Sequence, residues 1–169
     1  MAILEILQYP NPLLKKKCEK VDQIDNKIKS LIDNMVETMY DANGIGLAAS
    51  QVGILQRVIV IDVSPMEPEK GLLVMINPEI ISEEGDIEYE EGCLSLPEFR
   101  EKVKRKEKVK VMGISPEGKE IITEADGILA IAFQHEIDHL NGILLLDRVS
   151  RLKREIYKNK LRKEKEGRI

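Results

Sequence analysis

The sequence predicts an α+β fold, in which short antiparallel or mixed β-sheets pack around one buried central helix. Two observations support this prediction. Residues 124–140 form a helical stretch that is apolar nearly all round, as expected of a helix enclosed by other elements. Residues 57–123 contain a series of short β-type segments that meander without intervening helices, which argues against alternating βαβ units.

The first expected element is a helix over residues 25–43. Its apolar side chains recur with helical spacing, at Ile28, Leu31, Ile32, Met35, Val36 and Met39. Asp25 is a suitable N-cap, and Gly44 can close the end of the helix. A glycine-rich turn around a small apolar run then occupies residues 44–53.

The middle of the chain is expected to form strands, because it is rich in β-branched and aliphatic side chains between turn-forming residues. The segments with this character are residues 57–63, 72–76, 79–90, 102–114 and 121–123. We expect residues 64–71 to form a loop and the third segment to bend at Gly85. A turn at residues 116–118 should precede the last of these strands.

The buried helix is predicted over residues 124–140 and should end at Gly142. Its apolar side chains are Ile128, Leu129, Ile131, Ala132, Phe133 and Ile137. A short strand at residues 143–146 and a last helix at residues 149–166 are expected to follow. The apolar stripe of this last helix thins out, so its second half should stay solvated or meet a partner.

The composition is that of a soluble globular protein. Of 169 residues, 43% are apolar and 33% are charged, which excludes an intrinsically disordered chain. No stretch approaches the ~20 apolar residues of a membrane span, and no secretory leader is recognisable. We therefore expect a cytoplasmic protein without a membrane partner. In that setting Cys18 and Cys93 suit a metal or catalytic role better than a disulfide.

Charge is distributed unevenly along the chain. Residues 148–169 contain 10 Lys or Arg against 3 Asp or Glu, whereas the whole chain has a net charge of −4. A basic tail on an acidic body suggests a polyanionic partner, and a merely solvated helix is the alternative. We expect no sequence-specific binding of nucleic acid.

The two histidines of the chain, His135 and His139, stand four residues apart on the predicted buried helix. Residues at this spacing share one face, so both imidazoles can reach one ion. Glu136 can reach a water beside that ion, which completes the HExxH pattern of metal-dependent hydrolases. The alternatives are a chance spacing or two core histidines satisfied by hydrogen bonds. Asp138 on the same helix is expected either to support the ligands from behind or to form a structural ion pair, with Arg105 as its candidate partner.

A catalytic ion needs a third protein ligand and one open position. Because the sequence has no other histidine, a cysteine or a carboxylate must supply that ligand. Cys93 follows a glycine in the turn-like stretch 90–97, where a thiolate can point at an ion. The alternative for Cys93 is a small buried apolar side chain. Cys18 lies in a charged N-terminal stretch and is expected to be passive.

Three segments, in this order, resemble the motifs of peptide deformylases, which remove the formyl group from the N-terminal methionine of new bacterial proteins. They are Gly44-Ile-Gly-Leu-Ala-Ala-Ser-Gln51, Glu91-Gly-Cys-Leu-Ser95 and Gln134-His-Glu-Ile-Asp-His139. No motif position departs from the family pattern. The resemblance extends over nearly the whole chain and is weakest at residues 64–71 and after residue 148. The middle motif is similar to that of the bacterial group with a helical C-terminus.

The resemblance implies one divalent metal ion, with Fe²⁺ as the native metal and zinc, nickel or cobalt able to replace it. The ligand set alone does not choose among these metals. The implied ligands are Cys93, His135 and His139. Glu136 would act as general base toward a water that the ion activates. The Gln51 side-chain amide and the Leu94 backbone N–H would stabilise the oxyanion. The products would be formate and a free methionine N-terminus.

The methionine side chain of such a substrate needs an apolar pocket beside the ion. The candidates are Ile45, Ile128, Ile131 and Ala132, for each of which plain core packing is the alternative. On the helix, Ile128 and either Ile131 or Ala132 share a stripe with His135. Gly46 lets the backbone approach the substrate closely. Arg100 could meet the substrate backbone, and Glu91 could orient the turn before the cysteine, so both are also candidates for the substrate-binding region.

The expected partners are N-formyl-Met nascent peptides and the ribosome. Deformylases with a helical C-terminus dock on the ribosome through it, and the phosphates of ribosomal RNA suit a basic tail. Residues 1–147 would then form the catalytic domain, and residues 148–169 a basic helical extension of the same domain. Two other classes stay open: a metalloendopeptidase, which shares the HExxH pattern, and a structural zinc module, which would need a fourth ligand such as Cys18.

Overall fold

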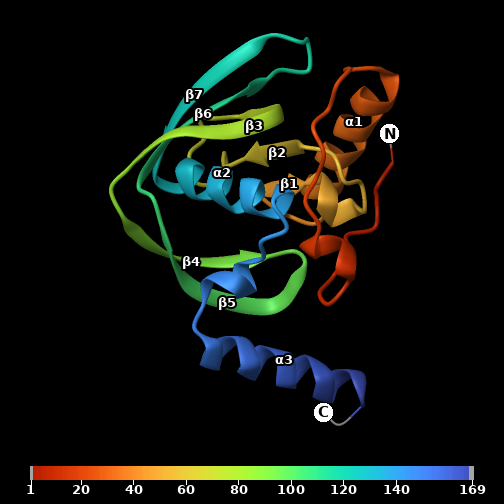
Figure 1. Cartoon of the computed structure of the whole chain (residues 1–169), viewed down its shortest axis with the longest axis vertical. Coiled ribbons are helices and arrows are strands. Elements are labelled where there is room, and N and C mark those ends of the chain that lie inside the picture. Colours follow the sequence, from red (N-terminus) through yellow and green to blue (C-terminus); the bar gives the residue numbers. More distant parts are fainter. Residues whose placement is uncertain (1, 168–169) are drawn as a thin grey trace.

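Helix α2 (Gly127–Leu140) lies between two β-sheets in the computed structural model, which describes residues 2–167 (Figure 1). A five-stranded sheet covers one side of the helix, and a two-stranded sheet lies on the other. Most side chains of α2 are buried, as its nearly uniform apolar character requires. The predicted α+β architecture with a buried central helix is confirmed.

All neighbouring strands are antiparallel. The larger sheet has the order β1-β2-β3-β6-β7, with bounds β1 (Gly46–Ala48), β2 (Val58–Asp62), β3 (Leu72–Glu84), β6 (Lys108–Ile114) and β7 (Glu120–Asp126). The smaller sheet is the hairpin of β4 (Ile87–Cys93) and β5 (Leu96–Arg105). This hairpin, which we call the arm, is inserted between β3 and β6, and those two strands pair with each other.

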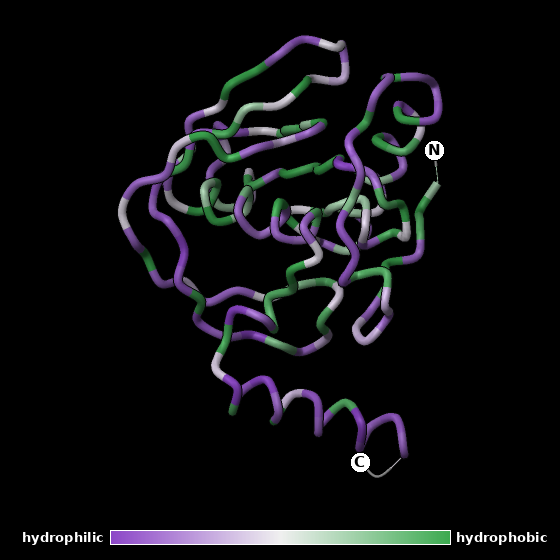
Figure 2. Tube along the Cα trace, in the orientation of Figure 1, coloured by the Kyte–Doolittle hydropathy of each residue, from purple (hydrophilic) through white to green (hydrophobic). Residues whose placement is uncertain are grey.

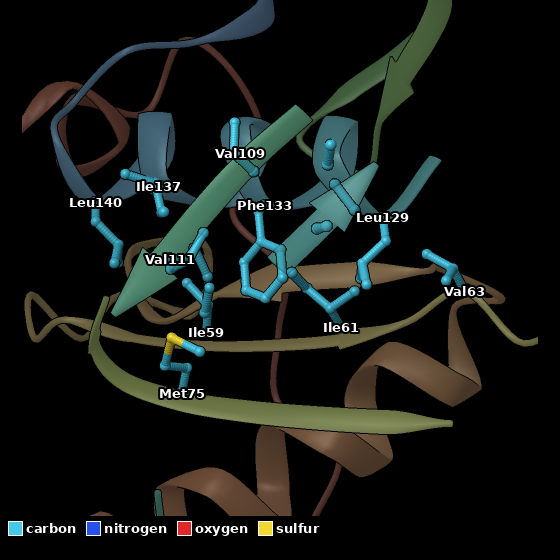
Figure 3. Close-up of a cluster of buried hydrophobic side chains, with 14 of the residues drawn as sticks. Ile59, Ile61, Val63, Met75, Val109, Val111, Leu129, Phe133, Ile137 and Leu140 are labelled. Atoms are coloured by element: carbon cyan, nitrogen blue, oxygen red, sulfur yellow. The ribbon is translucent and has the colours of Figure 1, made fainter. Parts of the chain in front are cut away.

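Strand β2 is buried on both faces, which explains its uninterrupted apolar sequence. Ile59 and Ile61 belong to the core cluster that contains Phe133 of α2 (Figure 3). Val58 and Val60 point to the opposite face and belong to a second cluster with the apolar side chains of α1 (Asn26–Asp41). The sheet therefore separates α1 from α2, and the site described below is built on the α2 side.

Helix α1 begins as predicted but ends differently. Asp25 is the N-cap, and its side chain accepts a hydrogen bond from the first turn. At the other end, Asn43 takes the left-handed conformation that we expected of Gly44, with φ of 56°. The Gly44 N–H then donates to the Met39 carbonyl at 2.9 Å, which closes the helix as a Schellman motif. Asparagine can serve here because it tolerates this conformation better than most residues do.

Strand β3 is longer than predicted. Residues 72–76 and 79–84 were expected in separate strands, but they form one strand that passes through Pro78. The pairing with β6 shifts register between Ile76 and Glu79. Such an irregularity accommodates a proline, which cannot donate a hydrogen bond to the ladder. A proline was therefore not sufficient evidence for the end of the strand.

The segment 102–114 was expected as one strand and is in fact divided between β5 and β6 at Lys106 and Glu107. Neither glycine nor proline marks this corner in the sequence. The backbone N–H and carbonyl of Lys106 instead bind the side chain of Gln134, both at 2.8 Å. A residue on α2 therefore makes the break, which no local pattern in the strand could indicate.

The ends of α2 show one wrong prediction and one confirmed prediction. Residues 124–126 belong to β7, because they continue its register with β6 as far as Asp126 opposite Lys108. At the other end, Gly142 terminates the helix as predicted, with φ of 75°. A Cβ at Gly142 would lie 2.4 Å from the Lys15 carbonyl oxygen, so only glycine fits this turn.

The strand predicted at residues 143–146 is also wrong. Leu145–Arg148 is a 3₁₀ helix, labelled η3. Leu144, Leu145 and Leu146 are all buried, which an alternating strand with one solvated face would not allow. The consecutive leucines therefore reflect a fully enclosed turn between α2 and the C-terminal helix.

Helix α3 (Arg151–Lys165) lies at one end of the molecule, beside β5, and most of it is hydrophilic (Figures 1 and 2). Tyr157 is buried against Phe99, and its hydroxyl donates to the Pro97 carbonyl at 2.8 Å. Leu152 and Ile156 are 70% and 59% exposed and so do not contribute to this packing. Within residues 2–167, no helix combines the length and apolar character that a membrane crossing requires.

Candidate metal centre and active site

The three sequence motifs come together at α2. The first motif forms the loop after α1, strand β1 and the 3₁₀ helix η2 (Ala49–Val52). The second forms the end of β4 and the turn of the arm, and the third is on α2 itself. Residues from all three line a single cavity of about 460 Å³. The arm and the large sheet therefore bring segments that are distant in sequence to one site.

Cys93, His135 and His139 form the one group of potential metal ligands found within residues 2–167. Their donor atoms all lie within 4.8 Å of one another. The Cys93 Sγ is 3.3 Å from the His139 Nε2. Donor atoms at the usual ~2.0–2.3 Å from a tetrahedral ion lie roughly 3–4 Å apart. One thiolate and two imidazoles in this arrangement fit a transition-metal ion with one open position. Cys18 is not part of the group.

The Nδ1 atoms of His135 and His139 differ in their surroundings. The Nδ1 of His135 is 3.0 Å from a carboxylate oxygen of Glu91. An Nδ1–H that donates to this oxygen leaves the Nε2 lone pair free for an ion, as is common for ligating histidines. The Nδ1 of His139 is buried without a hydrogen-bond partner among the described residues. Glu91 therefore orients only one of the two imidazoles.

Burial and neighbouring charges shift the pKa values at this centre. Burial raises the pKa of Glu136 to about 7. Burial also lowers the pKa of His139 well below its usual value, which favours the neutral imidazole that ligates metals. It likewise acts to lower the pKa of His135, but the Glu136 carboxylate and the Cys93 sulfur outweigh it and hold that pKa well above its usual value. The strongest shifts thus fall on the two candidate histidine ligands and on the carboxylate beside them, as is typical of functional sites.

Glu136 is buried on α2 and lines the cavity. Its Oε1 has no hydrogen-bond partner among the described residues. Its Oε2 lies 2.4 Å from the place that a Cβ on Gly46 would occupy. The absence of a side chain at Gly46 is therefore what makes room for this carboxylate beside the first motif.

Gln51 is held by hydrogen bonds at both ends of its side-chain amide. The Oε1 accepts from the Ala48 N–H at 3.0 Å, and the Nε2 donates to the Ser95 Oγ at 3.0 Å. The same Nε2 lies 3.7 Å from the Cys93 Sγ. The N–H groups of the amide are thus directed toward the second motif and the candidate ligand.

All seven candidates for the substrate-binding region line the cavity: Ile45, Gly46, Glu91, Arg100, Ile128, Ile131 and Ala132. Gln51, Leu94 and Glu136 line it as well. The Arg100 side chain is largely exposed. The Glu91 side chain is buried, and Arg105 and His135 already occupy its carboxylate.

Sequence reasoning missed several other residues that line the cavity, among them Met66, Tyr89, Leu96, Glu98 and Phe99. Four of the five flank the second motif in sequence. Their closeness to Cys93 along the chain could therefore have indicated that they line the same cavity. Met66 has no such signal, because it lies in the loop between β2 and β3, far in sequence from the three motifs.

A buried ion-pair network lies behind the ligands. The predicted pair of Asp138 with Arg105 is confirmed at 2.8 Å. Arg105 also forms a two-point contact with Glu91, with N···O distances of 2.8 and 2.9 Å. The hydrogen bonds of Glu91 with His135 and Arg105 outweigh the effect of burial and hold the pKa of Glu91 below its usual value. Arg148 from η3 adds two further bonds to Asp138. The sequence did not indicate this second arginine.

Comparison with known proteins identifies the family. Residues 3–155 match the family model described as polypeptide deformylase. The peptide deformylase of Thermodesulfovibrio yellowstonii is 59% identical over 98% of this chain and 100% of its own length. That of Syntrophobacter fumaroxidans is 50% identical over 97% of this chain and 96% of its own.

Solved structures agree with these relatives. A peptide deformylase from Legionella pneumophila is 44% identical, with a TM-score of 0.90 over 97% of this chain and 96% of that chain. The enzyme of Ehrlichia chaffeensis, in complex with actinonin, is 38% identical, with a TM-score of 0.91 over 97% and 98%. Motifs, fold and relatives thus give one answer: this chain belongs to the polypeptide deformylase family and is an enzyme of that family.

Proposed function

We propose that this chain removes the formyl group from the N-terminal formyl-methionine of nascent polypeptides and releases formate, using a metal ion held by Cys93, His135 and His139. One observation carries the proposal: three donor atoms that could bind a metal lie together on the helix and turn that also place Glu136 at the cavity, and one Glu136 oxygen has no hydrogen-bond partner among the described residues. Membership of the deformylase family supports the reaction itself.

The proposed resident ion is Fe²⁺, with zinc, nickel and cobalt as alternatives. A ligand set of one thiolate and two imidazoles suits each of these metals. When bound, the ion would supply a Lewis acid that permits hydroxide to form near neutral pH. A structural zinc site is less well supported, because the group of donor atoms holds three residues and a closed structural site needs four.

The residues around the donor atoms have complementary proposed roles. Glu136 takes the proton of the attacking water and later gives it to the leaving amine of methionine. The Gln51 amide and the Leu94 backbone N–H donate hydrogen bonds to the oxyanion. Leu94 directly follows Cys93 in the turn of the arm, so its backbone is held beside the ligand.

The cavity suits a methionine side chain. Its apolar wall is formed by Ile45, Ile128, Ile131 and Ala132. We assign Arg100 to the backbone of the peptide, because its side chain lines the cavity and is 62% exposed, with only a long contact of 3.9 Å to the exposed carboxylate of Glu90. For Glu91 we favour the orientation of His135 over a substrate contact, because that carboxylate is buried and already paired.

We expect anaerobically prepared protein to release one formate for each formyl-Met tripeptide that it deformylates. The same protein should contain about one iron per chain. Formate and bound metal should be measured on the same sample. An internal peptide without a formyl group serves as the control and should not be cleaved. Cleavage of that peptide without formate release would indicate a metalloendopeptidase, and activity in protein without bound metal would contradict the metal-dependent mechanism.

We further propose that the basic tail, residues 148–169, brings the enzyme to the ribosome in the cytoplasm, where nascent chains emerge. The tail has ten basic residues against three acidic ones. Its exposed apolar side chains, Leu152 and Ile156, are also available to a partner. Of the basic side chains in the described part of the tail, Arg148, Lys153 and Lys160 form ion pairs with acidic residues of the body. A helix that merely covers the domain is the alternative.

A chain ending at Lys158 should lose most ribosome co-sedimentation and keep its turnover of a free formyl-Met peptide. This truncation retains Tyr157 with its contacts to Phe99 and Pro97, although it removes the partly buried Leu161. Binding of the full chain should also weaken steeply with added salt, because phosphate contacts release counterions. Salt-insensitive binding, or loss of peptide turnover on truncation, would show that the tail acts through the fold.

A further inference from the structure

Arg148 begins a continuous series of ion pairs that ends at a proposed metal ligand. Its guanidinium donates to both carboxylate oxygens of Asp138, at 2.8 and 3.0 Å. Asp138 also accepts from Arg105 at 2.8 Å, and Arg105 holds both oxygens of Glu91. Glu91 then contacts the Nδ1 of His135 at 3.0 Å. The series therefore joins the C-terminal segment to the metal centre.

The alternation of basic and acidic side chains along this series explains how Arg148 can affect His135 at its other end. The Arg105 side chain is 3% exposed and lies between two carboxylates, which share its five N–H donors. Asp138 has a second guanidinium, from Arg148, whereas Glu91 has only Arg105. Without Arg148, Asp138 would depend on Arg105 alone and would compete more strongly with Glu91 for it. A Glu91 carboxylate that Arg105 holds less firmly would in turn fix the orientation of the His135 imidazole less firmly.

We infer that Arg148 is a positioning residue for the metal ligand His135 and acts through Asp138, Arg105 and Glu91; the inference rests on the proposed metal site. A fixed Glu91 holds the imidazole of His135 by its Nδ1 at 3.0 Å and so sets the orientation of the ring toward the other two donor residues. The segment at the start of the tail is then part of the metal centre's support, and a truncation that removes Arg148 would weaken metal binding.

Arg148 is the member of the series that can be changed with least damage to the fold. Its side chain is 43% exposed, so its replacement leaves Asp138 accessible to water and no enclosed cavity. Arg105 is unsuitable, because removal of a buried guanidinium leaves two uncompensated carboxylates. The rival explanation is a local ion pair that only ties η3 to α2, which would affect thermal stability and not the metal.

The test compares the full-length chain with Arg148→Met, Arg148→Lys and a control, Lys29→Met, whose exposed side chain has no ion pair within the described residues. Each protein is loaded with nickel, and the rate of metal loss to a chelator is measured together with kcat, KM and melting temperature. We expect Arg148→Met to lose nickel about 3- to 10-fold faster, below the ~10–100-fold typical of a direct partner of a ligand. Arg148→Lys should recover part of this effect, and Lys29→Met should match the original chain.

A double-mutant cycle with Glu91→Gln tests whether Arg148 acts on His135 through Glu91. If Arg148 acts through Glu91, Arg148→Met should add little to the metal loss of Glu91→Gln. Additive effects, or a lower melting temperature with unchanged metal loss, would overturn the inference and leave the proposed function standing. An original chain that binds no metal would overturn the proposed function and this inference together.

Discussion

Glu136→Gln should retain the metal ion and lower kcat by roughly 10²–10⁴, the usual contribution of a positioned general base. Glutamine has nearly the same shape as glutamate, so its amide can remain in the space that Gly46 leaves open. It cannot accept and return a proton, however. Because Glu136 is 4% exposed, bulk water has little access to replace it in that role.

The measurement is kcat for a formyl-Met peptide, with metal content determined on the same preparation. Glu124→Gln is a matched control, because Glu124 lies on β7 with its side chain 80% exposed and forms one surface ion pair, with Lys110, within residues 2–167. That variant should retain full activity. Near-normal turnover in a metal-replete Glu136→Gln protein would exclude Glu136 as the base.

Gln51→Glu should lower kcat by about 10²–10³, which corresponds to the ~2.7–4 kcal/mol of a lost oxyanion donor. The substitution keeps the acceptor for the Ala48 N–H and replaces the Nε2 donor by a second acceptor. The new carboxylate would also repel the developing oxyanion. KM should change little, because the lost interaction forms mainly in the transition state.

Ser95→Ala is the informative control for this prediction. It removes the anchor at 3.0 Å from the Gln51 Nε2 but leaves the donor in place, so a smaller loss of kcat is expected. If only KM rises in Gln51→Glu, the amide is a ground-state contact. If metal is lost and kcat per bound metal is unchanged, the amide acts on Cys93, whose sulfur lies 3.7 Å away.

The parts of the fold that follow from local sequence were predictable. The uniform apolarity of α2 and the i, i+4 spacing of its histidines are properties of a single helix, and both indicated a buried element with a shared ligand face. The run of aliphatic residues in β2 likewise predicted a strand. The residue that ends α1 did not follow from the sequence, because both asparagine and glycine can adopt the left-handed conformation that Asn43 has here.

The features that depend on distant residues were not predictable. The corner at Lys106 exists because Gln134 binds its backbone, and Met66 lines the cavity only because the loop after β2 lies near the arm and α2. Arg148 is one of many basic residues in the tail, and nothing in its neighbours distinguishes it. Its pairing with Asp138 depends on the three-dimensional course of η3. Periodicity and composition carry no information of this kind.

The insertion of the arm between two paired strands has a consequence for the order of folding. Glu84 and Lys108 are partners in the β3–β6 ladder, although the whole arm separates them in sequence. Closing a loop of that length costs conformational entropy, which grows with the logarithm of the loop length. Pairing within the arm first brings Ile87 opposite Arg105, after which only the short corners 85–86 and 106–107 remain to be closed.

We therefore expect the arm to form as a local hairpin before the β3–β6 ladder forms, since contacts between residues close in sequence form faster than contacts between distant ones. Cys93 would then already lie in an ordered turn when the long-range docking of α2 begins. That docking brings His135 and His139 to the cysteine only at the end. The ability to bind a metal would thus appear late in folding, and its appearance would report the completion of the native structure.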